Sequence, residues 1–140
     1  CMCHGALQMP FTVDHVVEMV RHVYSGRVVF YDGDAEVAPG VTVHKTGGHS
    51  RGLQAVRVET ANGPVCVASD AAHTYENFLT GKLFPIVADV EDMLKGVETI
   101  RKLAGVDERV IPGHDPLIAK YYPTHGQSGF IWRLDLPRIG

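Results

Sequence analysis

The sequence predicts an α+β fold, and three observations support that class. Two segments carry apolar residues at helical spacing, several short runs are rich in β-branched residues, and an Asn-Gly turn joins two of these runs. The chain has 140 residues, is 45% hydrophobic and contains no stretch with the composition of an interdomain linker. We therefore expect one unit of strands and helices.

The first predicted helix spans residues 13–24, where valines recur at helical spacing and Thr12 is placed to cap the first turn. Residues 27–31 are rich in β-branched and aromatic side chains, which predicts a strand. A second strand, residues 41–45, alternates after the turn formed by Pro39-Gly40. A helix followed by two strands is therefore expected in this part of the chain.

The clearest predicted hairpin joins residues 53–60 and 65–69. Between them lies Ala61-Asn62-Gly63-Pro64, and an Asn-Gly pair readily adopts the positive φ angles of a tight connection. After a predicted loop over residues 71–88, Asp89 is placed to cap a second amphipathic helix.

That second helix covers residues 90–104. A short strand over residues 109–111 and one or two helical turns over residues 117–122 are predicted to follow it. No internal repeat appears.

Composition and charge exclude several classes of function. The formal net charge is -3 and no block of Lys and Arg appears, which argues against nucleic-acid or anionic-membrane binding. No apolar run approaches the roughly 20 residues that span a bilayer, and no leader pattern opens the chain, so we expect a cytoplasmic location. The odd set of three cysteines, Cys1, Cys3 and Cys66, argues against a disulfide framework.

Three short motifs place metal-binding side chains at the ends of predicted strands or in the loops between them. His49 lies among glycines, Asp70 follows an apolar strand, and His114 lies in Pro-Gly-His-Asp-Pro. Burying an unpaired carboxylate costs several kcal/mol, and a nearby cation would offset that cost. Taken singly, Asp70 could cap a turn and either histidine could be a surface group. Asp115 could orient an imidazole.

In order and spacing, these motifs resemble the C-terminal half of the metallo-β-lactamase-fold hydrolases, and within them the N-acyl-homoserine-lactonase-like branch. The residues that carry the resemblance are Gly48-His49-Ser50-Arg51-Gly52, Ser69-Asp70-Ala71-Ala72, Glu76-Asn77-Phe78 and Ile111-Pro112-Gly113-His114-Asp115-Pro116. The resemblance implies an αββα sandwich, of which this chain would hold one mostly antiparallel sheet with its covering helices.

The resemblance also implies a site with two divalent metal ions, zinc or else iron, cobalt or manganese. His49 would bind one ion, His114 the other, and Asp70 would bridge them. A hydroxide held between the ions would open a lactone ester such as an N-acyl-homoserine lactone, the reaction of quorum quenching. Such hydroxide exists at neutral pH because a metal lowers the pKa of bound water to about 7.

One position departs from the pattern of these lactonases. They often carry a tyrosine three residues after the bridging aspartate, whereas this chain has His73. An imidazole can donate a hydrogen bond or a proton at neutral pH, and Tyr75 is a nearby substitute. With Asp70, these two residues form the predicted catalytic set. Apolar residues of the same loop could line an acyl pocket or pack on the sheet: Phe78, Leu79, Leu83 and Phe84.

The His-x-His-x-Asp-His run that completes such sites is absent from this sequence. We therefore expect residues 1–140 to form one half of a longer enzyme, inactive alone and normally covered by the missing N-terminal half. The alternatives are hydrolysis of another ester or a thioester, and a non-catalytic fragment that forms a homodimer or binds a partner through its exposed sheet.

Overall fold

The computed structural model describes residues 4–9, 11–127 and 129–139. It divides into two compact units, Cys1–Tyr31 and Asp32–Gly140. Cys1 and Cys3, which enter the cysteine count, lie outside the described residues, whereas Cys66 is buried and free. Among the described residues, no helix is long and apolar enough to cross a membrane.

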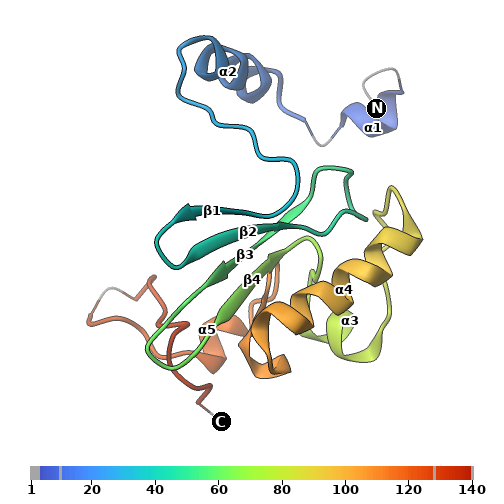
Figure 1. The fold of residues 1–140 in the computed structure, drawn as a ribbon. Coiled ribbons are helices and arrows are strands. Elements are labelled where there is room, and N and C mark those ends of the chain that lie inside the picture. Colours follow the sequence, from blue (N-terminus) through green and yellow to red (C-terminus); the bar gives the residue numbers. More distant parts are fainter. Residues whose placement is uncertain (1–3, 10, 128, 140) are drawn as a thin grey trace. The chain divides into compact units, whose positions relative to one another are not determined.

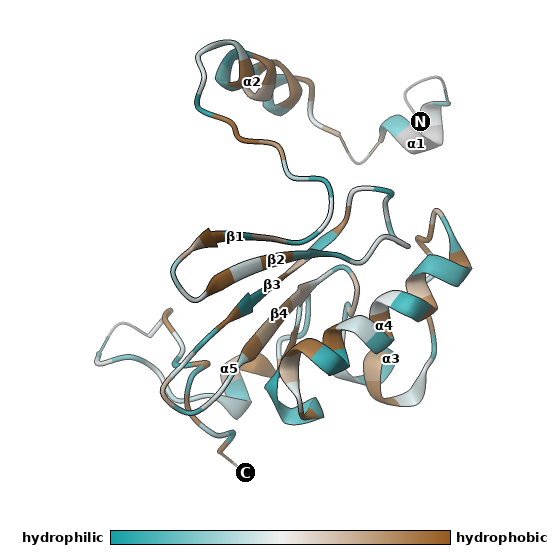
Figure 2. Ribbon diagram, viewed as in Figure 1, coloured by the Kyte–Doolittle hydropathy of each residue, from teal (hydrophilic) through white to brown (hydrophobic). Residues whose placement is uncertain are grey.

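The first unit contains two helices, α1 (Gly5–Gln8) and α2 (Val13–Tyr24). The bounds of α2 confirm the predicted helix, although the Thr12 side chain makes no capping hydrogen bond. No residue of α2 is buried within the structure, and its valines form a stripe on one side. Figure 2 shows this stripe in brown against the teal of the polar side.

The prediction of a strand over residues 27–31 is wrong. These residues form no strand, and Val29 and Phe30 are largely exposed. A strand that was not predicted, β1 (Ala35–Ala38), lies on the other side of Asp32-Gly33. Strand propensity acts only where a partner is within reach, and the Pro39-Gly40 turn brings β1 back against β2.

The second unit is built on one mixed sheet of five strands in the order β1-β2-β3-β4-β5 (Figure 1). The strands after β1 are β2 (Val41–Lys45), β3 (Gln54–Val58), β4 (Val65–Ser69) and β5 (Val110–Pro112). All pairs are antiparallel except β4 with β5, which is parallel. The α+β class and the mostly antiparallel sheet are thus confirmed, as is the β3-β4 hairpin.

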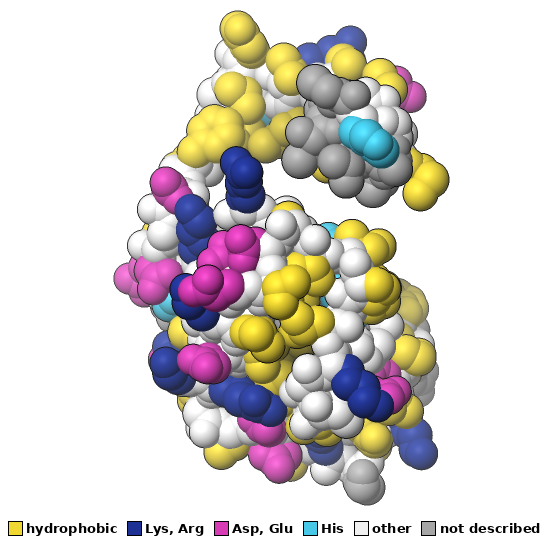
Figure 3. All heavy atoms as spheres, turned by 90° about the vertical axis from the view of Figure 1, so that its right-hand side faces the viewer, with side chains coloured by type: hydrophobic (Ala, Val, Ile, Leu, Met, Phe, Trp, Pro, Cys, Tyr) yellow, Lys and Arg dark blue, Asp and Glu magenta, His cyan; other side chains and the backbone are white. Residues whose placement is uncertain are grey.

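Helix α4 (Val90–Ala104) packs on β3, β4 and β5. Asp89 caps it by accepting a hydrogen bond from the Asp92 N–H, as predicted. Its inner side joins a buried cluster with residues of the sheet, among them Ala55, Cys66 and Val110. Figure 3 shows apolar side chains gathered on one face of the second unit. Val90 and Leu94 of this helix are among the exposed hydrophobic residues.

The segment predicted as a loop over residues 71–88 contains a helix, α3 (Tyr75–Thr80). The Thr74 side chain caps it by accepting from the Asn77 N–H, and Gly81 ends it in the left-handed conformation. A short 3-10 helix η1 (Asp107–Arg109) precedes β5, and α5 (Ile118–Tyr121) confirms the last predicted helical turn.

The opposite face of the sheet carries a second cluster over β4 and β5. Its buried residues are Val65, Ile111 and Tyr122, and side chains of α5 and the tail pack against them. Over β2, β3 and the middle of β4, cross-strand pairing aligns five half-buried valines: Val41, Val43, Val56, Val58 and Val67.

Candidate metal centre

Asp70 leaves the sheet directly after β4. The preceding residue, Ser69, has a φ of +49°, and the pairing of β4 with β5 shifts register between Val67 and Ser69. A left-handed non-glycine residue costs on the order of 1–3 kcal/mol. This turn of the backbone directs the Asp70 carboxylate out of the strand end, where its side chain is 25% exposed.

His114 approaches Asp70 from the neighbouring strand. Its backbone N–H donates to the His73 carbonyl at 2.9 Å, and the Gly113 N–H donates to the Ala72 carbonyl at 2.9 Å. The loop after β5 is therefore tied to the segment after β4. This brings Nε2 of His114 to 2.7 Å from Oδ1 of Asp70.

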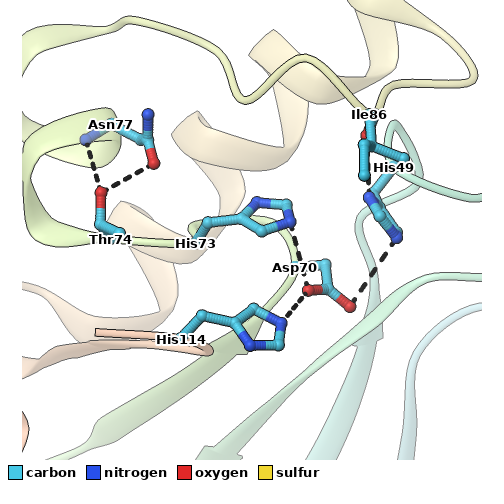
Figure 4. A network of polar contacts seen from close by, with 7 residues as sticks. All are labelled: His49, Asp70, His73, Thr74, Asn77, Ile86 and His114. Atoms are coloured by element: carbon cyan, nitrogen blue, oxygen red, sulfur yellow. Dashed lines mark hydrogen bonds and ion pairs between the residues drawn. The ribbon is translucent and has the colours of Figure 1, made fainter. Parts of the chain in front are cut away.

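His49 approaches from the other side of the carboxylate, on the loop between β2 and β3. Gly47 and Gly48 before it have φ of +66° and +84°, which glycine adopts without strain. The His49 Nδ1 lies 2.8 Å from the carbonyl oxygen of Ile86, and its Nε2 lies 3.9 Å from Oδ2 of Asp70. Figure 4 shows the carboxylate between His49 on one side and two histidines on the other.

The Ile86 carbonyl fixes the tautomer of His49. A carbonyl oxygen only accepts hydrogen bonds, so Nδ1 carries the proton and the neutral ring presents the lone pair of Nε2 to the carboxylate. Two lone pairs that face each other at 3.9 Å fit a cation between them, because zinc binds imidazole nitrogen and carboxylate oxygen at about 2.0–2.2 Å each. These residues therefore fit a metal ion.

His73 is the second histidine beside Oδ1 of Asp70, with its Nε2 at 3.4 Å. Its side chain is 7% exposed and its ring stacks on Phe84, with centroids 3.8 Å apart. Burial lowers the pKa of His73, and the neighbouring His49 and His114 add to this while Asp70 opposes it. The neutral imidazole is the form that binds metals.

The structure thus brings together all three predicted metal ligands, of which Asp70 also belongs to the predicted catalytic set, and one further predicted catalytic residue, His73. Within the described part of the chain, one ligand atom from each of Asp70, His73 and His114 lies within 4.8 Å of the others. Ile86 and Phe84, which hold His49 and His73, were not predicted in these roles. These contacts join residues that are separated by other elements or loops along the chain, and no local sequence pattern predicts them.

Tyr75, the other predicted catalytic residue, lies at the start of α3. Its ring packs against Tyr121 and beneath the Arg138 guanidinium, 4.3 Å from the ring centroid. Its hydroxyl is buried, and this burial raises the pKa of the phenol. None of its contacts among the described residues is with His49, Asp70 or His114.

Asp115 has a structural use instead of orienting an imidazole. Its two oxygens accept from the backbone N–H groups of Tyr75 at 2.7 Å and Leu117 at 2.9 Å. The apolar loop residues differ in burial, since Leu79 is exposed and Leu83 and Phe84 are half-buried. Phe78 is fully buried, and the cavity beside His73 and Phe84 measures about 10 Å³, the space of a single water and too small for an acyl chain.

Comparison with curated proteins identifies lactonases as relatives. An N-acyl homoserine lactonase of a Bacillus species is 35% identical over 86 residues, which is 60% of this chain and 34% of the relative. The AiiA lactonase of Bacillus thuringiensis subsp. kurstaki is 36% identical over the same shares. The chain therefore spans about a third of the length of these relatives. No family profile matches it.

Solved structures agree with this result. An N-acyl homoserine lactone hydrolase with N-hexanoyl-L-homoserine at its catalytic metal centre superposes with a TM-score of 0.56 at 33% identity, over 64% of this chain and 36% of that one. AidC, a dizinc quorum-quenching lactonase, shares the fold at 16% identity, with a TM-score of 0.56 over 83% of this chain and 40% of that one. Over the part that they share, this chain is similar in sequence and in fold to the N-acyl homoserine lactonases, which have the metallo-β-lactamase fold.

Proposed function

We propose that this chain supplies part of the metal centre of a hydrolase that opens N-acyl homoserine lactones or similar lactone esters. The observation that carries the proposal is the Asp70 carboxylate, which has the Nε2 of His49 facing one oxygen and the Nε2 of His114 facing the other. A relative of the same fold carries a hydrolysed lactone at its metal centre, which supports this substrate class.

The residues of this chain have distinct tasks in that reaction. His49 would hold one divalent ion and His114 the other, with Asp70 between them. Such ions, zinc among them, lower the pKa of bound water and polarise a carbonyl. The Ile86 carbonyl keeps the lone pair of His49 turned toward the centre. His73 belongs to the same centre, since it lies against the Asp70 carboxylate.

The Oδ2 side has a single histidine, which alone is a weak ligand set for an ion. We therefore propose that lactone hydrolysis requires ligands beyond those that this chain provides, on a further segment that covers the centre. The chain by itself should then turn over lactone poorly.

Replacing Asp70 with Asn in the whole protein tests the function. Loss of the bridging charge should lower lactone turnover by about 1000-fold or more, because even outer-shell partners of a metal are worth roughly 10- to 100-fold. Titration of the released acid against an acyl-homoserine lactone, a simple ester and a thioester separates lactonase from the other hydrolases. Asp34→Asn is the matched control, since Asp34 pairs with His44. Unchanged turnover in Asp70→Asn would refute the proposal.

A second candidate is self-association through the face formed by Val41, Val43, Val56, Val58 and Val67. These five valines are half-buried and lie side by side across three strands. Sedimentation of the chain with Val56→Asp should show loss of association, whereas Asp70→Asn should leave it unchanged. If the chain without the substitution sediments as a monomer, self-association is excluded.

A further inference from the structure

The two oxygens of Asp70 have unequal surroundings. Oδ2 faces one histidine, His49, whereas Oδ1 faces two, His73 at 3.4 Å and His114 at 2.7 Å. The rings of His73 and His114 lie nearly parallel, at an interplanar angle of 23° with centroids 5.4 Å apart. Both therefore present Nε2 to the same oxygen from one side (Figure 4).

The side chain of His73 is held beside Asp70 by its surroundings. Its carbonyl accepts the His114 N–H, Phe84 covers its ring, and only 7% of its side chain is exposed. A group that donates to a substrate must be reachable, as His114 is with 63% exposure. The His73 Nε2 lies instead 3.4 Å from Asp70 Oδ1, and ligand atoms of His73, Asp70 and His114 lie within 4.8 Å of one another.

We propose that His73 is a metal ligand, so that Asp70 Oδ1, His73 Nε2 and His114 Nε2 form a three-ligand site for one divalent ion within this chain. Three protein ligands with one open position is the usual composition of a catalytic zinc site. The inference rests on the proposed metal-dependent function. It gives His73 the role of a ligand in place of a hydrogen-bond donor to the substrate.

The remaining nitrogen of His73 is consistent with this role. Nδ1 is buried without a hydrogen-bond partner from the described residues, and His73 lines the cavity of about 10 Å³ beside Phe84. A ligating histidine usually donates its other N–H to a carbonyl, a carboxylate or water. This cavity has about the volume that one such water occupies.

Cobalt(II) titration of the chain without substrate tests the proposal, because cobalt takes the place of zinc and its absorption spectrum reports the ligands. Wild type should bind one equivalent on the Oδ1 side. His73→Phe keeps an aromatic ring against Phe84 and should weaken binding by more than about 100-fold, beyond the loss typical of an outer-shell partner. His44→Gln is the matched control, because His44 pairs with Thr42 and Asp34.

A cysteine at the same position gives a second readout that does not depend on affinity. His73→Cys should produce a thiolate-to-cobalt charge-transfer band that wild type, with its three cysteines, and His44→Cys both lack. Absence of that band, equal cobalt affinity of His73→Phe and wild type, or no cobalt binding by the wild-type chain would each overturn the ligand role. Lactone turnover is measured separately, so a failure of the proposed function is distinguished from a failure of this site.

Discussion

The two loops that carry His49 and His114 reach the same carboxylate but depend on different parts of the fold. The His114 loop rests on the sheet, because β5 pairs with β4 and a Cβ on Gly113 would lie 2.8 Å from the carbonyl carbon of Ser69. The His49 loop rests on α4, because a Cβ on Gly48 would lie 2.5 Å from the Cα of Met93.

Hydrogen bonds follow the same division. The carbonyl of Gly48 accepts the N–H groups of Ala88 and Asp89, at the start of α4. The N–H of Gly113 donates to the carbonyl of Ala72, two residues after Asp70. One side of the carboxylate is therefore fixed by strand register and the other by the contact of a loop with a helix. The two sides should be separable by mutation.

Gly48→Ala should have the largest effect on stability. The added methyl group meets the backbone of α4, and residue 48 has a φ of +84°. Left-handed strain of about 1–2 kcal/mol and overpacking of about 1–3 kcal/mol should together lower the free energy of unfolding by about 3 kcal/mol. Urea denaturation measures this change.

Gly52→Ala is the matched control in the same loop, since a Cβ there would meet nothing within 4 Å. We expect it to change the unfolding free energy by less than about 0.5 kcal/mol. Equal effects at Gly48 and Gly52 would show that the loop does not rest on α4.

Gly113→Ala should come next, with a loss of about 2 kcal/mol from overpacking against Ser69 alone, because its conformation carries no left-handed strain. The variant should weaken cobalt binding at the Oδ1 side, whereas Gly48→Ala should largely spare it. Cobalt titration of both variants checks this order. If Gly48→Ala weakened cobalt binding more than Gly113→Ala, the two sides of the carboxylate would not be supported separately.

Much of this arrangement could be predicted from the sequence, because it rests on local patterns. Apolar spacing and the Asp89 cap located α4, and the Asn62-Gly63 turn located the hairpin that ends at Asp70. The pattern of His49, Asp70 and His114 identified the relatives before their geometry was known. Each of these signals lies within a few residues of the feature that it predicts.

The parts that the sequence did not predict depend on contacts across the fold. Residues 27–31 have strand propensity but pair with no strand among the described residues, whereas β1 gains a partner through a turn. Helix α3 does have local signals, the Thr74 cap and Gly81, which the loop prediction overlooked. The burial of His73 under Phe84 has no local signal at all, since it depends on how the segment before α4 folds back.

The smallest effect on stability is expected in strand β4, which leads to Asp70. Cys66 of β4 is fully buried against Val110, and burial raises the pKa of its thiol to about 12, compared with about 8.5 in an unfolded chain. Between these two values the unfolded chain loses a proton that the folded chain keeps. Stability from this group should therefore fall as pH rises, by about 1 kcal/mol from pH 8.5 to 9.5.

Cys66→Ala removes this dependence, so the gap in unfolding free energy between wild type and Cys66→Ala should narrow by the same amount over that interval. Urea denaturation of both proteins at the two pH values measures the gap, and other titrating groups cancel in the comparison. Because Cys66 lies in the buried core and is none of the proposed ligands, cobalt affinity at a fixed pH of 7 should not change. A constant gap would mean that the thiol ionises equally in the folded chain, and that the core under Asp70 is open to water.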